Sequence, residues 1–149
     1  MEDLYLYHAT DRKNLEAILK NGLLTHPPHH MYEGYDCEGK IYLAFDPDIA
    51  ESYVEASDES PDDIVVLKIG LSMLKPENIG YDWNNRCEYE SDINSCVYYA
   101  DIPGNCIQEC NPSNEPSQTI KHFKGTDLYE IVLGVFDEEV ETNLENYDY

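Results

Sequence analysis

The sequence predicts an α+β fold: a split, mostly antiparallel β-sheet with two helices packed on it. Two observations predict this class. Apolar runs of strand length outnumber the segments with helical spacing. Both helical segments come early in the chain, so strands dominate the rest. No segment of the chain repeats another.

The first strand and the first helix follow each other directly. Residues 4–8 are expected to form the strand, because leucine and tyrosine alternate there. Thr10 or Asp11 is the candidate N-cap of the helix, and apolar side chains then recur at helical spacing over residues 15–23. Gly22 is expected to end this helix.

A second strand and helix are predicted in the same order. Residues 40–45 form the expected strand. Asp46 is the candidate N-cap of the next helix, and Pro47 suits its first position, where a missing N–H costs nothing. The expected buried stripe of this helix consists of Ile49, Ala50, Tyr53 and Val54.

Three further strands are predicted in the remainder of the chain. Residues 64–71 are nearly all apolar, which is typical of a strand buried on both faces. Residues 96–102 (CVYYADI) and 128–136 are the other two. Residues 74–79 are expected to form a connecting turn.

The length of 149 residues fits one domain with a core of its own. We place this domain at residues 1–136 and an acidic tail, frayed or briefly helical, at residues 137–149. No apolar run is long enough to span a membrane, and the acidic N-terminus does not look like a secretory signal. We therefore expect a cytoplasmic protein with reduced cysteines and no metal site.

The charge is strongly negative, with 31 acidic residues against nine basic ones and a formal net charge of −22. Such a surface repels nucleic acids and anionic membranes, because binding to phosphate requires Lys and Arg. Two interpretations remain. The charge keeps the protein soluble, or it attracts a basic partner, for which the protein would imitate nucleic acid.

Two residues on the predicted strands could contact a ligand. His8 ends the first strand immediately before a capped helix, a place where a histidine and nearby backbone N–H groups could meet a ligand. Tyr42 alternates with Ala44 along the second strand, so the two share a face. An aromatic wall beside a small residue suits stacking against a flat ring.

These segments carry a family resemblance. LYHATDRKNLEAILKNGL followed by KIYLAFDPDIAESY resembles the ADP-ribosyltransferase-like fold, in the branch with a His-Tyr-Glu triad. That branch includes the poly-ADP-ribose polymerases and the RNA 2′-phosphotransferases. The order of the motifs and the later segment Asp101-Ile102-Pro103 match it as well, so the resemblance covers most of residues 4–107.

The resemblance implies NAD as the substrate and assigns roles to individual residues. His8 would hydrogen-bond the ribose next to the nicotinamide, with Thr10 beside it, and Tyr42 would stack on the nicotinamide ring. Ala9 stands where the family usually has glycine. The expected NAD-binding residues are His8, Ala9, Thr10, Tyr42, Ala44 and Tyr53.

The third member of the triad has no direct counterpart. Active family members carry a glutamate at the head of the strand that corresponds to residues 96–101, where this chain has Asn94 and Ser95. A shifted register or a bulge would bring Glu90 or Asp92 to that place. Three alternatives stay open: Glu90 as the catalytic acid, Asp92 in that role, or no catalytic acid at all.

Two functions follow from these observations. The first is an NAD-dependent ADP-ribosyltransferase-like enzyme that modifies a macromolecule, and the acidic surface favours a protein target. RNA 2′-phosphate removal fits poorly, because the chain has only Arg12 and Arg86 to hold phosphate. The alternative is an inactive acidic binding protein that inhibits a basic nucleic-acid-binding partner, as phage-encoded anti-defence proteins do.

Overall fold

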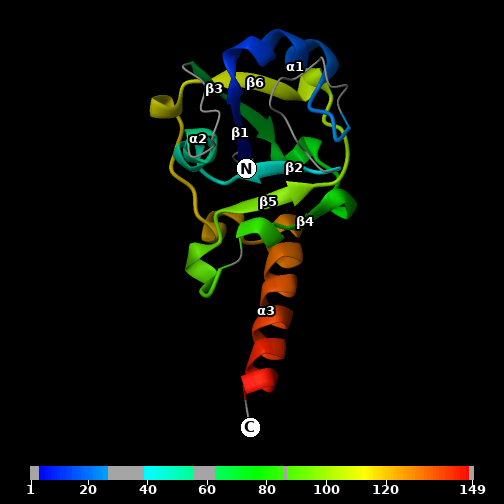
Figure 1. The fold of residues 1–149 in the computed structure, drawn as a ribbon, viewed down its shortest axis with the longest axis vertical. Helices are drawn as coiled ribbons and strands as arrows, with labels where there is room; N and C mark the ends of the chain where they lie inside the picture. The colour runs from blue at the N-terminus through cyan, green and yellow to red at the C-terminus, as the bar shows by residue number, and fades with distance from the viewer. Residues whose placement is uncertain (1–3, 27–38, 56–62, 86, 148–149) are drawn as a thin grey trace.

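The computed structural model describes residues 4–26, 39–55, 63–85 and 87–147. Within these residues, six strands form one antiparallel sheet in the order β4-β5-β2-β1-β3-β6 (Figure 1). The strands are β1 (Tyr5–Asp11), β2 (Ile41–Ala44), β3 (Ile64–Gly70), β4 (Ile79–Tyr81), β5 (Ser95–Tyr98) and β6 (Ile107–Cys110). The predicted α+β class with an antiparallel sheet is therefore confirmed.

The two central strands of the sheet, β1 and β2, pair over a very short length. Strand β1 pairs with β3 along its whole length, from Tyr5 to Asp11, and β2 pairs with β5 over all four of its residues. Strands β1 and β2 share a single register pair, Tyr7 with Ala44. The sheet therefore consists of two three-stranded halves, β4-β5-β2 and β1-β3-β6, that are joined at one point.

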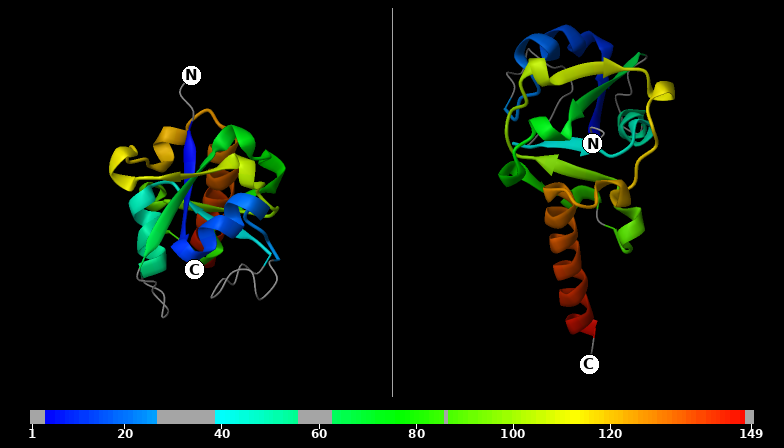
Figure 2. Two further views of the ribbon diagram at one scale, coloured as in Figure 1. Left: turned by 90° about the horizontal axis from the view of Figure 1, so that it is seen from above. Right: turned by 180° about the vertical axis from the view of Figure 1, so that it is seen from behind.

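The described residues form three α-helices, one more than predicted: α1 (Leu15–Asn21), α2 (Pro47–Glu55) and α3 (Asp127–Tyr147). The predicted start of α2 at Asp46 and Pro47 is confirmed, whereas α1 has Asn14 as its N-cap and Asp11 caps the 3₁₀ turn (Arg12–Asn14) that precedes it. The Asp11 side chain accepts the N–H of Lys13 in the 3₁₀ turn before α1, and the Asp46 side chain accepts the N–H of Asp48 at 2.9 Å. Figures 1 and 2 show that α3 leaves the sheet and carries the C-terminus away from it.

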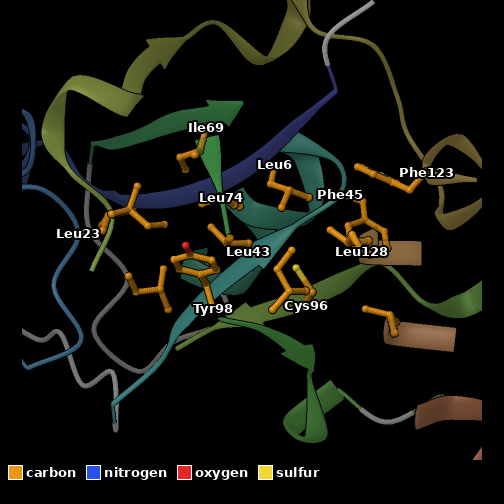
Figure 3. Close-up of a cluster of buried hydrophobic side chains, with 14 of the residues drawn as sticks. Leu6, Leu23, Leu43, Phe45, Ile69, Leu74, Cys96, Tyr98, Phe123 and Leu128 are labelled. Carbon is orange, nitrogen blue, oxygen red and sulfur yellow. The ribbon is translucent and has the colours of Figure 1, made fainter. Parts of the chain in front are cut away.

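Alternation along the strands divides the apolar side chains between two faces. One face carries the larger core, in which Leu6, Leu43 and Leu128 are fully buried (Figure 3). The opposite face carries a smaller cluster under α2, formed by Tyr7, Ala9, Ala44, Ala50 and Val66. Residues of β1 and β2 thus contribute to both cores.

The predicted strand at residues 128–136 is wrong, because these residues form the first part of α3. Leu128, Val132 and Phe136 are buried at a spacing of four residues, which is a helical stripe. Except for Glu130 and Gly134, the intervening residues are also apolar, so the run lacks the period that separates helix from strand. Helix α3 continues without a break through residues 137–147, across the expected start of the acidic tail.

The remaining differences concern strand ends and edges. Strand β1 continues to Asp11, so His8 lies inside the strand and not at its end. Strand β5 stops at Tyr98, and Ile102 is held by an isolated bridge to Leu23. The edge strands β4 and β6 contain only three and four residues, too few for an apolar pattern to predict them.

Among the helices of the described residues, none combines the length and the apolar composition that crossing a bilayer requires.

Gly22 offers a direct test of the junction between α1 and the sheet. It ends α1 with a φ of +90°, and an added Cβ would collide with the carbonyl oxygen of Ile102. Gly22→Ala is expected to lower the free energy of unfolding, measured by chemical denaturation, by about 2 kcal/mol or more.

Gly134→Ala is the matched control. Gly134 lies in α3, and a Cβ added there would meet no atom within 4 Å outside its own helix backbone and chain neighbours. There alanine should raise the free energy of unfolding by about 0.5–1 kcal/mol, because it favours helix more than glycine does. Equal losses in the two variants would contradict this account of Gly22.

Candidate functional site

Five polar side chains meet where β5 begins. Asn94 and Ser95 are at the head of this strand, and Asp82 directly follows β4, which pairs with β5. Asn85 lies in the 3₁₀ turn after Asp82, and Tyr53 reaches the group from α2. We call these five residues the β5 polar cluster.

Hydrogen bonds connect the whole cluster. Ser95 Oγ donates to Asp82 Oδ2 at 2.9 Å, and Asn85 Nδ2 donates to Ser95 Oγ at 3.1 Å. Asn85 Nδ2 also lies 2.6 Å from Asn94 Oδ1, which accepts the Tyr53 hydroxyl at 2.9 Å. A continuous path of hydrogen bonds therefore runs from the tyrosine on α2 to the Asp82 carboxylate.

The cluster extends from solvent into the protein. Tyr53 is 41% exposed, whereas Ser95 is 3% and Asp82 5% exposed. Burial of part of the Tyr53 ring raises the pKa of its hydroxyl, and the nearby Asp82 carboxylate raises it further. Tyr53 thus remains protonated at neutral pH and serves as a donor at the exposed end.

Tyr42 and Ala44 share a face of the sheet with this cluster. Ala44 is the register partner of Ser95, and Tyr42 is the partner of Val97. Paired residues of antiparallel strands lie on one face, and residues two apart lie on the same face again. The structure therefore places three predicted NAD-binding residues, Tyr42, Ala44 and Tyr53, around the head of β5.

His8 and Thr10 belong to the other face of the sheet. Tyr7 pairs with Ala44, so alternation assigns His8 to the face opposite the Tyr42 ring. Thr10 Oγ1 accepts a hydrogen bond from Asn14 at 3.1 Å, which connects β1 to the start of α1. Ala9 lies in the small core under α2.

The contact of His8 with Tyr42 runs through the backbone. His8 Nδ1 lies 2.9 Å from the carbonyl oxygen of Tyr42, and a carbonyl can only accept, so this nitrogen carries the proton. The ring is 8% exposed, and burial lowers the pKa of His8, so the imidazole is neutral at pH 7. His8 thereby holds β2 against β1 where the two strands diverge.

Gln118 makes the same kind of bridge at the opposite end of the join. Its buried Nε2 donates to the carbonyl oxygen of Tyr5 at 2.9 Å and to that of Phe45 at 2.8 Å. One of these acceptors belongs to β1, and the other directly follows β2. Sequence reasoning missed Gln118, because nothing in the polar loop around it indicates a buried role.

The two carboxylates considered for the catalytic role lie elsewhere. Glu90 is exposed in the 3₁₀ turn Glu90–Asp92 and accepts the hydroxyl of Tyr129, on α3, at 3.5 Å. Asp92 is exposed in the same turn. Asp82 is the carboxylate that the structure brings to the head of β5, and it was missed because strand β4 was not predicted.

Among the residues that the structure describes, the cysteines and acidic side chains do not gather into a metal site. Within the described residues, no group of three or more His, Cys, Asp or Glu side chains is placed to hold a metal ion. Cys87, Cys96, Cys106 and Cys110 are free thiols, and Cys37 lies outside the described residues. Burial raises the pKa of Cys110 to about 11, so this thiol is protonated at neutral pH.

The sequence matches no model of a known protein family, and no curated protein matches it significantly.

The buried His8 predicts a loss of stability in acid. Its pKa is lower in the folded chain than the ordinary 6.5, so below pH 6.5 the unfolded chain binds more protons. The free energy of unfolding should therefore fall as the pH drops through this range, by at most about 1.4 kcal/mol per pH unit from this residue.

The comparison uses chemical denaturation at several pH values between 7.5 and 5. His8→Asn keeps a donor for the Tyr42 carbonyl but cannot titrate, so its stability should depend less on pH. His26→Asn, at an exposed position, should follow the wild type. Parallel losses in the wild type and His8→Asn would contradict the assignment of this pH dependence to His8.

Proposed function

We propose that the protein binds NAD and transfers ADP-ribose from it to a macromolecule. One observation carries the proposal: Tyr42 and Ala44 lie on one sheet face beside a hydrogen-bonded hydroxyl–carboxylate pair, Ser95 and Asp82. The resemblance of the flanking segments to the ADP-ribosyltransferase-like fold is the second support.

The proposed binding mode uses the chemistry of the nicotinamide end of NAD. This end is a flat cationic ring, which an aromatic side chain can stack on and a nearby negative charge can attract. Tyr42 supplies the ring, and Ala44, two residues further along the same face, is buried under α2. Tyr53 and Asn94 offer polar groups at the more exposed end of the cluster, where ribose hydroxyls could bind.

The proposed reaction breaks the bond between the ribose carbon and the nicotinamide nitrogen. The bonding electrons leave with nicotinamide, which becomes neutral, and positive charge develops on the ribose. A lone pair of the acceptor then forms the new bond to this carbon, and the acceptor releases a proton to water. A carboxylate close to the developing charge lowers the barrier.

A protein is the proposed class of acceptor. The net charge of −22 disfavours approach to a nucleic acid and favours a basic protein surface. With water as acceptor, the same reaction releases nicotinamide and ADP-ribose, which gives an assay that requires no knowledge of the target.

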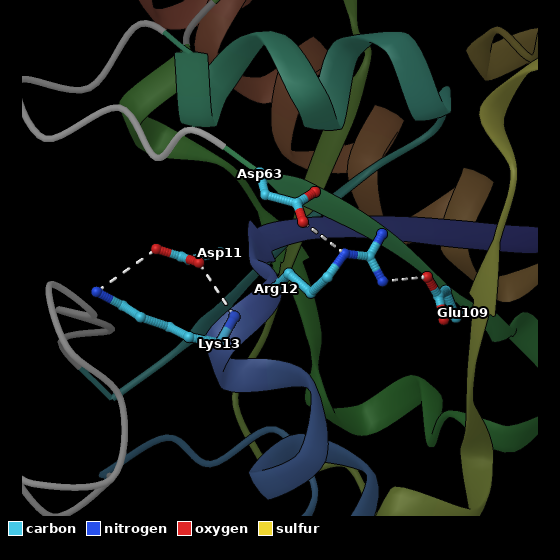
Figure 4. Close-up of polar contacts among 5 residues, drawn as sticks. All are labelled: Asp11, Arg12, Lys13, Asp63 and Glu109. Atoms are coloured by element: carbon cyan, nitrogen blue, oxygen red, sulfur yellow. Dashed lines mark hydrogen bonds and ion pairs between the residues drawn. The ribbon is translucent and has the colours of Figure 1, made fainter.

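A second candidate function rests on how the basic side chains are used. Arg12 contacts Asp63 and Glu109, each at 2.9 Å, and Lys13 lies 3.5 Å from Asp11 (Figure 4). These two cations therefore pair with carboxylates of the protein itself. The many acidic side chains without such a cation could contact basic groups of another protein. This arrangement supports an acidic protein that occupies the nucleic-acid-binding surface of a basic partner.

NAD binding is the first prediction of the proposed enzyme. Calorimetric titration should detect binding of NAD to the wild type, and Tyr42→Ala should weaken it at least about tenfold because the stacking surface is lost. Tyr42→Phe should retain the affinity. Tyr89→Ala removes a tyrosine that is exposed elsewhere and should have no effect. A wild type without NAD binding would refute the proposal.

The second candidate makes a separate prediction. The protein should bind a purified basic DNA-binding protein at about 50 mM salt, release it at about 500 mM, and compete with duplex DNA for it. The charge-driven contact weakens as ions screen it. Binding that is insensitive to salt, or that leaves DNA in place, would argue against this function.

A further inference from the structure

We propose that a cavity between α2 and the β3–β6 edge of the sheet accepts an arginine side chain of a basic partner protein. This inference rests on the second candidate function, the binding of a basic partner, and it names a place where one cation of that partner would bind. The cavity is separate from the β5 polar cluster.

The cavity has a volume of about 320 Å³ and opens to solvent. This volume lies at the lower end of the range of small-ligand sites, about 300–1,000 Å³. Helix α2 contributes Glu51 to its lining, β3 contributes Ile64 and Val66, and β6 contributes Glu109 and Cys110. The lining therefore combines apolar and acidic residues.

The apolar part of the lining belongs to one face of the sheet. Ile64 and Val66 lie two residues apart on β3, and Cys110 is the register partner of Val66 on β6, so strand alternation places all three on that face. Val66 is buried in the small core under α2, and Ile64 and Cys110 pack against this core. Such a surface suits the methylene groups of a long basic side chain.

The charged part of the lining favours a cation. Glu51 and Glu109 are acidic, and Arg12 is the basic residue among them. The guanidinium of Arg12 lies 2.9 Å from a carboxylate oxygen of Asp63 and 2.9 Å from one of Glu109, as Figure 4 shows. These two carboxylates more than balance its single charge, so the cavity attracts cations and repels anions.

Glu51 supplies a carboxylate for the incoming group. It is partly buried on α2, and among the described residues none forms an ion pair or a hydrogen bond with its side chain. A carboxylate can accept two parallel hydrogen bonds from the planar guanidinium of arginine. The guanidinium is also hydrated more weakly than the ammonium of lysine, so a partly apolar cavity favours arginine.

A protein is the proposed source of this arginine because of the charge of the whole chain. The net charge of −22 attracts a surface that carries many cations, but it does not determine how that surface is oriented. An arginine held in a cavity would determine the orientation, and buried arginines are frequent among the residues that dominate the affinity of interfaces.

The first experiment titrates N-acetyl-arginine amide into the isotopically labelled full chain and records the NMR shifts of the backbone amides. Saturable shifts are expected in β3, in β6 and around Glu51, with a dissociation constant of roughly 1–10 mM. N-acetyl-citrulline amide has nearly the same shape without the charge, and it should bind at least about tenfold more weakly. Equal binding of the two compounds, or shifts spread over the whole acidic surface, would contradict the proposal.

The second experiment measures binding to the purified basic DNA-binding protein at about 50 mM salt. Glu51→Arg places a cation in the cavity and should weaken this binding at least about tenfold. Glu77→Arg is the matched control, because it changes the net charge equally at an exposed position before β4, the opposite edge strand of the sheet. It should weaken binding less than about threefold, since it changes only the overall field.

A milder pair of substitutions guards against loss of the fold. Glu51→Gln and Glu77→Gln keep the size of each side chain and remove one charge, and denaturation curves identify any variant that is unfolded. Glu51→Gln should weaken binding of the basic protein at least about threefold, and Glu77→Gln should leave it close to the wild type.

The outcomes separate this inference from the second candidate function. Equal effects at Glu51 and Glu77, or a cavity that does not bind the arginine compound while the basic protein still binds, overturn the inference alone. A wild type that binds the arginine compound but not the basic protein overturns the second candidate function, and with it the protein as the source of the arginine.

Discussion

The structure depends on the join between β1 and β2. A single register pair, Tyr7 with Ala44, connects the two halves of the sheet, where adjacent strands normally share several. Two buried side chains reinforce it: His8 donates to the backbone of Tyr42, and Gln118 donates to carbonyl oxygens on both sides. Side-chain hydrogen bonds thus replace the missing part of the ladder, and their burial makes them costly to break.

The candidate site lies across this join. Helix α2 packs mainly on β1, whereas Asn94 and Ser95 begin β5 in the other half of the sheet. Tyr53 on α2 donates to Asn94, so the β5 polar cluster connects the two halves by a second route. A change in the angle between the halves would alter the distance between Tyr53 and the head of β5. His8 therefore influences the β5 polar cluster by fixing β2.

The ends of helices could be predicted from the sequence, and the pairing of strands that are distant in the chain could not. Asp46 and Pro47 start a helix, and Gly22 ends one, because caps and backbone preferences act within a few residues. The strand expected at residues 128–136 is a helix, because a short, mostly apolar run fits either structure until its packing is known. Asp82 was overlooked for another reason. It lies 13 residues before Ser95 in the chain, and only the pairing of β4 with β5 brings the two side chains together.

Burial, and not abundance, distinguishes Asp82 in a chain with 31 acidic residues. Among the described residues, Asp46 and Asp82 are the two acidic side chains in the buried class. Asp46 caps α2 and accepts a hydrogen bond from the hydroxyl of Ser117. Its carboxylate therefore stabilises the start of α2 and the loop that carries Ser117. Asp82 accepts a side-chain hydroxyl at the head of β5, beside the face that carries Tyr42. The many exposed carboxylates contribute together to the field around the protein, whereas the two buried ones act on the groups that they contact.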